Sequence, residues 1–295
     1  MRPLTYYRPP TSSVRKVAKD KRIIAVTNQK GGVGKTTSAI NLAASLAAAN
    51  RRVLLVDGDP QGNATSGMGV TVESGSPSLY DVLLGEATVG DALRRNVLLE
   101  HLDVLPATPD LAGAEVELVN EAGREGRLAG ALRDAAEQYD YILIDCPPSL
   151  GLLTVNMLAA AESTLIPLQC EYFALEGLTQ LLRTVQMVRE NLNSELAIGG
   201  VLLTMYDSRL NLSRQVAEDA RGYFGDLVFR TVVPRNIRLA EAPSYGKPIL
   251  LYDISSVGAT SYMAVAKELI ERTERLEPTN NQSDSHPVVS EPATS

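Results

Sequence analysis

The stretch Lys30-Gly31-Gly32-Val33-Gly34-Lys35-Thr36-Thr37 constrains this chain more than any other. It follows an apolar run at 23–26 and precedes a helix-forming run at 38–49, which predicts a strand, a glycine loop and a helix. The glycines let the backbone turn tightly and point several N–H groups at one place, and the helix start adds free N–H groups and a positive dipole end. Lys35 supplies a mobile charge and Thr36 a hydroxyl that can ligate Mg²⁺. The segment therefore predicts a cradle for a nucleoside triphosphate.

The loop departs from the general pattern G-x-x-x-x-G-K-[ST], because Gln29 stands at the first glycine position and a second lysine, Lys30, opens the loop. In this form it resembles the deviant Walker A motif, K-G-G-x-G-K-[ST], of the ParA/MinD family of P-loop ATPases. The resemblance implies that residues 30–37 bind ATP and that Lys35 and Lys30 are catalytic. It also implies that Lys30 reaches across a dimer interface to the nucleotide of the partner subunit.

Two apolar runs end in carboxylates. Val53-Leu54-Leu55-Val56 is followed by Asp57-Gly58-Asp59-Pro60-Gln61-Gly62-Asn63, and Tyr141-Ile142-Leu143-Ile144 is followed by Asp145-Cys146-Pro147-Pro148. Neighbouring carboxylates repel each other unless a cation lies close, and a Mg²⁺-nucleotide would provide one. Asp59 could then orient a water toward the γ-phosphate; alternatively it is a turn residue that caps its own backbone.

Both segments resemble further motifs of the same family, D-x-D-P-Q-G-N and D-x-P-P. The resemblance assigns Asp59 to hydrolysis and gives Asp57 a supporting role. It places Asp145 and Asp59 near Mg²⁺, each through a water molecule, with the Thr36 hydroxyl as a further ligand. An apolar strand that ends in Asp is weak evidence by itself, but after a phosphate loop it indicates a Walker B strand.

The segment Val233-Pro234-Arg235-Asn236 follows another apolar run. An Asn side chain offers a donor and an acceptor to a base edge, and Pro offers a flat apolar surface; the alternative is an ordinary turn after a strand. In the resembled family the Pro and Asn of P-R-N take part in adenine recognition, which assigns Pro234 and Asn236 to the nucleotide. Residues 237–248 also look like the ParA/Soj branch of the family.

Residues 205–247 carry seven basic and five acidic side chains, whereas the whole chain has a net charge of −7. A negative protein does not attract DNA over its whole surface, but it can carry a local basic patch. A mixed, solvated face is the alternative. Arg209 and Arg238 match positions implicated in nonspecific DNA binding in ParA/Soj proteins, so the resemblance implies that both contact DNA.

Continuous apolar runs are typical of strands buried on both faces, and their alternation with helical stretches predicts right-handed βαβ units. We therefore expect an α/β, single-domain P-loop fold over residues 22–275, with a mostly parallel twisted sheet and helices on both faces. Ligands of such sheets lie at the carboxyl ends of the strands. The expected strands are 23–28, 53–57, 102–105, 141–145, 163–168, 198–204 and 228–233; the expected helices are 35–49, 78–84, 111–119, 127–138, 151–160, 175–192, 211–222 and 259–275.

Both ends of the chain differ in composition from its middle. We expect a disordered basic leader at 1–21, which touches nucleic acid or is merely solvated, and a disordered tail at 276–295. No apolar run approaches the roughly 20 residues that span a bilayer, and the N-terminus lacks a signal-peptide segment, so we expect a cytoplasmic, nucleoid-associated protein without membrane contact. Cys146 and Cys170 lack metal-ligand spacing and are expected to be buried thiols.

Together these features predict a ParA/Soj-type ATPase of chromosome or plasmid partition, with ATP and Mg²⁺ as cofactors and weak intrinsic turnover. The resemblance implies an ATP-bound homodimer, monomeric otherwise, that binds nonspecific double-stranded DNA and is released when a ParB-type centromere-binding protein stimulates hydrolysis. A MinD-like membrane ATPase should end in a basic amphipathic helix, which residues 287–292 do not suit. A nitrogenase-iron-protein relative would bridge an Fe–S cluster through its cysteines. A nucleotide-gated regulatory or positioning switch without a role in segregation is the remaining alternative.

Overall fold

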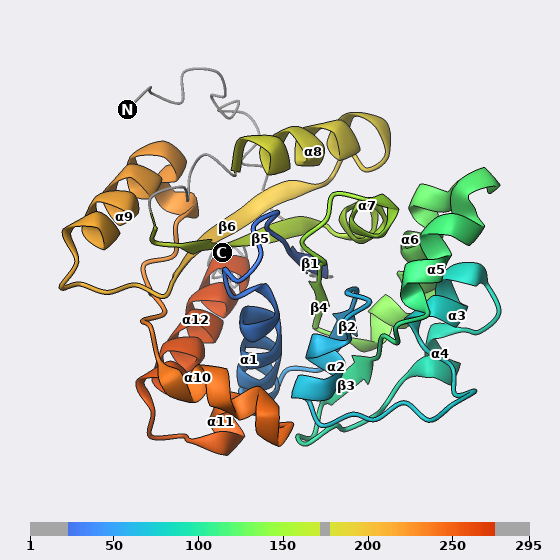
Figure 1. The fold of residues 1–295 in the computed structure, drawn as a ribbon, viewed down its shortest axis with the longest axis horizontal. Helices are drawn as coiled ribbons and strands as arrows, with labels where there is room; N and C mark the ends of the chain where they lie inside the picture. Colours follow the sequence, from blue (N-terminus) through green and yellow to red (C-terminus); the bar gives the residue numbers. More distant parts are fainter. Residues whose placement is uncertain (1–22, 172–177, 275–295) are drawn as a thin grey trace, which may run out of the picture.

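The computed structural model describes residues 23–171 and 178–274, and within them six parallel strands form one sheet in the order β3-β2-β4-β1-β5-β6 (Figure 1). This sheet confirms the expected α/β fold. The expected leader 1–21 and tail 276–295 lie outside the described residues, so the domain boundaries stay a prediction. The strands are β1 (Ile23–Val26), β2 (Val53–Asp57), β3 (Leu102–Leu105), β4 (Tyr141–Asp145), β5 (Ser163–Gln169) and β6 (Ala197–Thr204).

Helices cover both faces of the sheet, as expected, and each face has its own hydrophobic core. One core lies beneath α1 and α12 and includes Leu42 and Tyr262; the other lies beneath α3 and α5–α9 and includes Leu79 and Leu182. The helices are α1 (Lys35–Ala48), α2 (Asn63–Gly67), α3 (Leu79–Leu84), α4 (Val89–Ala92), α5 (Leu111–Glu117), α6 (Arg127–Ala135), α7 (Leu152–Ala160), α8 (Leu178–Asn191), α9 (Asn211–Phe224), α10 (Ile237–Glu241), α11 (Ile249–Tyr252) and α12 (Val257–Glu274).

The expected helices appear within a few residues of their predicted bounds wherever the structure describes them. The start of the helix expected at 175–192 falls outside the described residues, and α8 is seen from Leu178 onward. Four short helices, α2, α4, α10 and α11, were not expected. Each has only four or five residues, which is too short for a helical repeat of apolar residues to appear.

The register of the central strands brings the sequence motifs together at one edge of the sheet. Asp57 of β2 lies opposite Asp145 of β4, and Asp145 also lies opposite Val26 of β1. Because the strands are parallel, the loops that follow them meet at the same edge. The phosphate loop (residues 30–37) follows β1, so it lies beside both carboxylate motifs.

The prediction of a strand at residues 228–233 is wrong. Phe229 and Val233 donate their N–H groups to carbonyls of β6 at 2.9 and 2.8 Å, but these donors are four residues apart while their acceptors are two apart. The residues between them are therefore looped out of the ladder. The N–H groups of the two residues after Phe229 donate instead to the Glu268 carboxylate on α12. Apolar composition predicted the extended chain but could not reveal this competing acceptor.

Two smaller expectations concern the membrane and the cysteines. In the described ranges no helix has the length and apolar character needed to cross a bilayer. Cys146 and Cys170 are buried free thiols, as expected. Burial raises the pKa of both thiols, to about 11 for Cys170, so both are neutral at physiological pH.

Candidate nucleotide-binding site

Two buried polar side chains hold the phosphate loop in place. Asn28, just after β1, donates from Nδ2 to the Pro167 carbonyl at 2.8 Å and accepts the Lys30 N–H at 3.0 Å. Thr204, at the end of β6, donates its hydroxyl to the Val33 carbonyl at 2.8 Å. Sequence analysis missed both residues. Their only signal is a polar residue at the end of an apolar run, which many strand ends share.

The loop needs glycine where its backbone turns into α1. Gly32 has φ 74° and Gly34 has φ 89°, a left-handed conformation that costs other residues energy. Gly34 is also the N-cap of α1 and has no side chain to cap the helix. The first N–H groups of this 14-residue helix are therefore available to an anionic ligand, as the phosphate-cradle prediction requires.

The two lysines of the loop lie in different environments. Lys35 is 7% exposed, and its Nζ donates to the Lys30 carbonyl at 3.1 Å. Burial lowers the pKa of Lys35, and the nearby Asp145 carboxylate acts in the opposite direction. The Lys30 side chain is 37% exposed and forms an ion pair with Glu171 at 3.5 Å. Lys35 thus lies near the carboxylates, whereas Lys30 lies at the surface.

Asp57 is fully buried and acts as an internal anchor. Its Oδ2 accepts hydrogen bonds from the backbone N–H and the hydroxyl of Thr65, both at 2.7 Å, and its Oδ1 accepts the Asp59 N–H at 3.2 Å. Burial raises the pKa of Asp57, and the bonds from Thr65 oppose that shift. Asp57 therefore ties the start of α2 to the end of β2, in keeping with the supporting role expected for it.

Asp59 and Asp145 both lie near Lys35. Asp59 is 8% exposed, and its Oδ1 accepts the Gln61 N–H at 2.9 Å, so it caps its own turn while remaining beside the lysine. Asp145 is fully buried, and neither of its carboxylate oxygens accepts a hydrogen bond by distance and angle from any residue that the structure describes. Burial raises the pKa of Asp145 well above its ordinary value, and the neighbouring Asp57 adds to that shift.

These residues fit a bound Mg²⁺ ion. A buried carboxylate without donors is costly, and a cation or its water ligands would satisfy it. Mg²⁺ is held by one or two carboxylates together with substrate phosphates rather than by a full protein cage. No group of three or more His, Cys, Asp or Glu side chains within 23–171 and 178–274 is arranged to hold a metal ion by itself. Thr36 is the second residue of α1 and lies close enough to Asp145 to oppose its pKa shift.

Residues 233–236, the segment assigned to the adenine base, are connected to the phosphate loop by the end of β6. Thr204 contacts the loop, and two residues later Tyr206 pairs with Pro234 and accepts the Arg235 N–H at 3.3 Å. Asn236 is the N-cap of α10, and its Oδ1 accepts the Leu239 N–H at 3.3 Å. An Asn side chain can also donate from Nδ2 and accept at the second lone pair of Oδ1, as a base edge requires.

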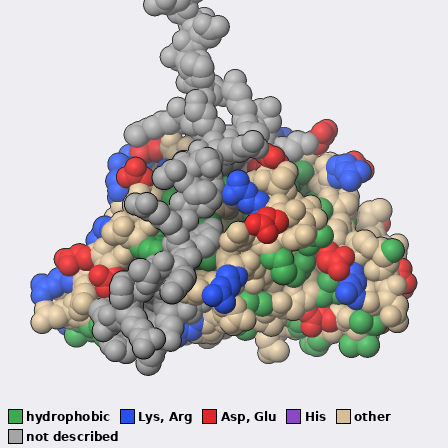
Figure 2. Space-filling model, turned by 90° about the horizontal axis from the view of Figure 1, so that it is seen from above, with side chains coloured by type: hydrophobic (Ala, Val, Ile, Leu, Met, Phe, Trp, Pro, Cys, Tyr) green, Lys and Arg blue, Asp and Glu red, His purple; other side chains and the backbone are tan. Residues whose placement is uncertain are grey.

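The two arginines expected to contact DNA are exposed, and carboxylates of the same chain pair with both. Arg209 forms two hydrogen bonds to Asp207, at 2.9 and 2.7 Å, and these lower the pKa of Asp207 to about 2. Arg238 pairs with Glu241 at 2.8 Å and lies 3.6 Å from Asp253. On the face seen in Figure 2, basic and acidic side chains are likewise interspersed wherever grey atoms do not cover them. A DNA contact by these arginines would therefore form beside, or compete with, existing ion pairs.

Known proteins resemble this chain over most of its length. A family profile described as AAA domain matches residues 21–198. The chromosome partitioning protein ParA of Myxococcus xanthus is 60% identical over 85% of this chain and 88% of its own length, and the sporulation initiation inhibitor protein Soj of Bacillus subtilis is 58% identical over 84% and 98%. Among solved structures, a cobyrinic acid a,c-diamide synthase of Mycobacterium smegmatis with bound ADP and magnesium is 40% identical and has a TM-score of 0.74, covering 86% of this chain and 96% of its own.

The relatives agree with the motifs, their order along the chain and the parallel sheet that carries them. The phosphate loop, the carboxylate motif after β2 and the Walker B aspartate all meet at the carboxyl ends of neighbouring strands. The chain therefore belongs to the ParA/Soj family of chromosome-partitioning ATPases, within the ParA/MinD group of P-loop proteins.

Proposed function

We propose that the ATP-bound form of this chain is a dimer that binds double-stranded DNA without sequence preference and leaves it when a ParB-type partner stimulates hydrolysis. The observation that carries this proposal is the different placement of the two lysines in one loop. Lys35 is buried beside the carboxylates, while Lys30 is exposed where a second subunit can approach. An added Cβ at Gly31, beside Lys30, would meet nothing within 4 Å.

In this proposal the residues divide the chemistry as follows. The loop backbone and Lys35 hold the phosphates, and Thr36, Asp145 and Asp59 hold Mg²⁺, the two carboxylates through its water ligands. Bound Mg²⁺ neutralises charge that develops on the phosphate oxygens. Asp59 orients the attacking water, and Lys30 adds positive charge from the partner subunit. A monomer lacks that second lysine, which accounts for the weak turnover expected of it.

Pro234 and Asn236 complete the site by contacting adenine. Arg209 and Arg238 bind DNA phosphates, which replace the carboxylates that pair with them in this structure. Such contacts carry no sequence information, so binding is nonspecific and localises the protein to the nucleoid. The chromosome-partitioning names of the close relatives support this role and a ParB-type partner.

The test is a DNA mobility shift with ATP over a salt series. Two phosphate contacts per subunit make about four per dimer, which predicts a log–log salt slope of roughly −3.6 and a loss of about a hundredfold between roughly 50 and 200 mM salt. The double variant Arg209→Ala/Arg238→Ala should lose DNA binding and keep ATP-dependent dimerisation. The control Arg51→Ala/Arg52→Ala removes the same charge just before β2, at the opposite end of the strands, and should bind DNA normally.

The results of this experiment test the DNA contacts, the role in segregation and the dimer separately. If the double variant shifts DNA as well as wild type, the assigned patch is wrong, and a variant lacking residues 1–21 tests whether the basic leader binds instead. If wild type dimerises with ATP but binds no DNA, the chain is a nucleotide-gated switch without a direct role in segregation. If no dimer forms with ATP, the role of Lys30 in the partner's site is wrong.

A further inference from the structure

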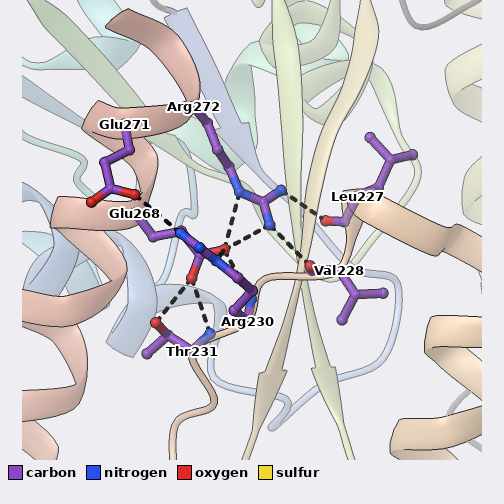
Figure 3. A network of polar contacts seen from close by, with 7 residues as sticks. All are labelled: Leu227, Val228, Arg230, Thr231, Glu268, Glu271 and Arg272. Carbon is purple, nitrogen blue, oxygen red and sulfur yellow. Dashed lines mark hydrogen bonds and ion pairs between the residues drawn. The ribbon is translucent and has the colours of Figure 1, made fainter. Parts of the chain in front are cut away.

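Glu268 of α12 is a buried carboxylate that gathers donors from two segments of the chain (Figure 3). Its side chain is 4% exposed. It accepts the backbone N–H groups of Arg230 and Thr231 at 2.9 and 3.0 Å and the Thr231 hydroxyl at 2.9 Å. Arg272, one turn further along α12, donates from Nε at 3.2 Å and from Nη2 at 2.7 Å. These five donors saturate the lone pairs of one carboxylate.

The hydrogen bonds around Glu268 and Arg272 do more than compensate for the burial of one charge. Burial alone would raise the pKa of Glu268, but the N–H groups of Arg230 and Thr231 and the Arg272 guanidinium hold it below its ordinary value. Arg272 also donates to the Leu227 and Val228 carbonyls at 3.3 and 2.9 Å. The network therefore binds donors and acceptors of residues 227–231, which precede the segment assigned to the base.

Residues 228–236, here called the strap, run from this network to Asn236. The strap touches β6 through Phe229 and Val233, and Glu268 occupies the two N–H groups that follow Phe229. Without Glu268 those N–H groups would be free to seek other acceptors, and the path from Phe229 to Pro234 would change. The path of the chain to Asn236 is therefore held at two places, by the contacts of Val233 and Arg235 with β6 and Tyr206 and by the acceptor that α12 supplies to Arg230 and Thr231.

The same helix is tied to the phosphate loop. Tyr262 of α12 is 1% exposed, and its hydroxyl lies 3.0 Å from the Ser38 hydroxyl in α1. α1 begins at Lys35, directly after the glycines of the loop. Tyr262 and Glu268 are six residues apart, which is about 9 Å along a helix. One helix thus connects the phosphate end of the site to the strap.

We propose that Glu268 is a positioning residue for the adenine base, because it holds the strap at a set distance from the phosphate loop through α12. The inference rests on the proposed assignment of Pro234 and Asn236 to adenine. It predicts that changes at Glu268 weaken the recognition of the base and leave the recognition of the phosphates unchanged.

The experiment compares the affinities of full-length protein for ATP, GTP and inorganic triphosphate, which has no base. Glu268→Gln keeps the shape but turns one acceptor into a donor that faces N–H groups. We expect ATP affinity to fall about tenfold, the ATP-to-GTP ratio to narrow, and triphosphate affinity to stay within twofold of wild type. The control Arg230→Ala removes a side chain that is 70% exposed and forms ion pairs with Glu268 at 3.6 Å and Glu271 at 3.0 Å. It keeps the backbone bond that holds the strap, so its ATP-to-GTP ratio should stay near that of wild type.

A second variant keeps the test informative if Glu268→Gln does not fold. Arg272→Lys retains the charge but cannot make all the bonds to the Leu227 and Val228 carbonyls, and it should narrow the same ratio to a smaller degree. A folded Glu268→Gln protein that keeps the wild-type ATP-to-GTP ratio overturns the inference. So does a parallel loss of ATP and triphosphate affinity. If wild type binds ATP no better than GTP or triphosphate, the base assignment itself fails, and this inference fails with it.

Discussion

Gly58 is the position where a single added methyl group should disturb the site most directly. It lies between Asp57 and Asp59, and its N–H donates to the Asp145 carbonyl at 2.9 Å. A Cβ at Gly58 would lie 2.7 Å from that carbonyl oxygen and 3.0 Å from Cε of Met157. The methionine side chain can move, but the carbonyl belongs to the strand that carries the Walker B aspartate. Gly58→Ala must therefore shift backbone in β2 or β4.

The expected losses of stability and turnover in Gly58→Ala follow from this clash with backbone. Overpacking that forces backbone shifts costs about 1–3 kcal/mol. For a domain of this size each kcal/mol lowers Tm by about 2–4 °C, so we expect Gly58→Ala to melt roughly 2–12 °C below wild type. A displacement of about 1 Å at catalytic groups can cost about a hundredfold in rate, so ATP turnover should fall by up to that factor.

Gly31→Ala is the matched control for this measurement. Gly31 has an ordinary φ, and an added Cβ there meets nothing within 4 Å. Its stability should stay within about 0.5 kcal/mol of wild type. Calorimetric melting without nucleotide tests both variants, and a steady-state ATPase assay then tests Gly58→Ala against wild type. If Gly58→Ala has the same Tm as wild type and Gly31→Ala, the predicted steric clash between Gly58 and the Asp145 carbonyl of β4 is refuted.

Further variants test the assigned roles one at a time. Lys35→Ala should abolish nucleotide binding in a calorimetric titration, and near-normal ATP affinity would show that the loop is not the principal site. Asp59→Ala should bind ATP, turn over very slowly and accumulate as a dimer in light scattering; a monomer or wild-type turnover would count against its role. Gly31→Val should bind ATP but fail to dimerise in sedimentation, since its side chain fits the monomer and obstructs only a second subunit. The stability that Glu268 contributes is present above the ordinary glutamate pKa of about 4.3 and is lost as pH falls through its lower folded-state value, so Glu268→Gln should flatten the acid side of the stability profile.

The motifs could be located from the sequence because each is local. A phosphate loop needs glycine at positions such as Gly34 and a lysine and a hydroxyl directly after it, and all of these are neighbours in the chain. Strands buried on both faces are continuous apolar runs, so β2 and β4 were found with their bounds unchanged. Parallel pairing then brings the residues after those strands together, which is why Asp57, Asp59 and Asp145 were expected in one place.

The sequence by itself thus determined the fold class and the family, and it predicted the residues at the phosphate end of the site. Only the tertiary structure decided how those residues are held, because the contacts join distant parts of the chain. Thr204 supports the loop across 171 positions, and Glu268 takes the Arg230 N–H across 38. An apolar sequence pattern predicts that a segment is buried and extended, but it does not show which acceptor binds the N–H groups of that segment. The same reason explains why residues 228–233 do not form a strand.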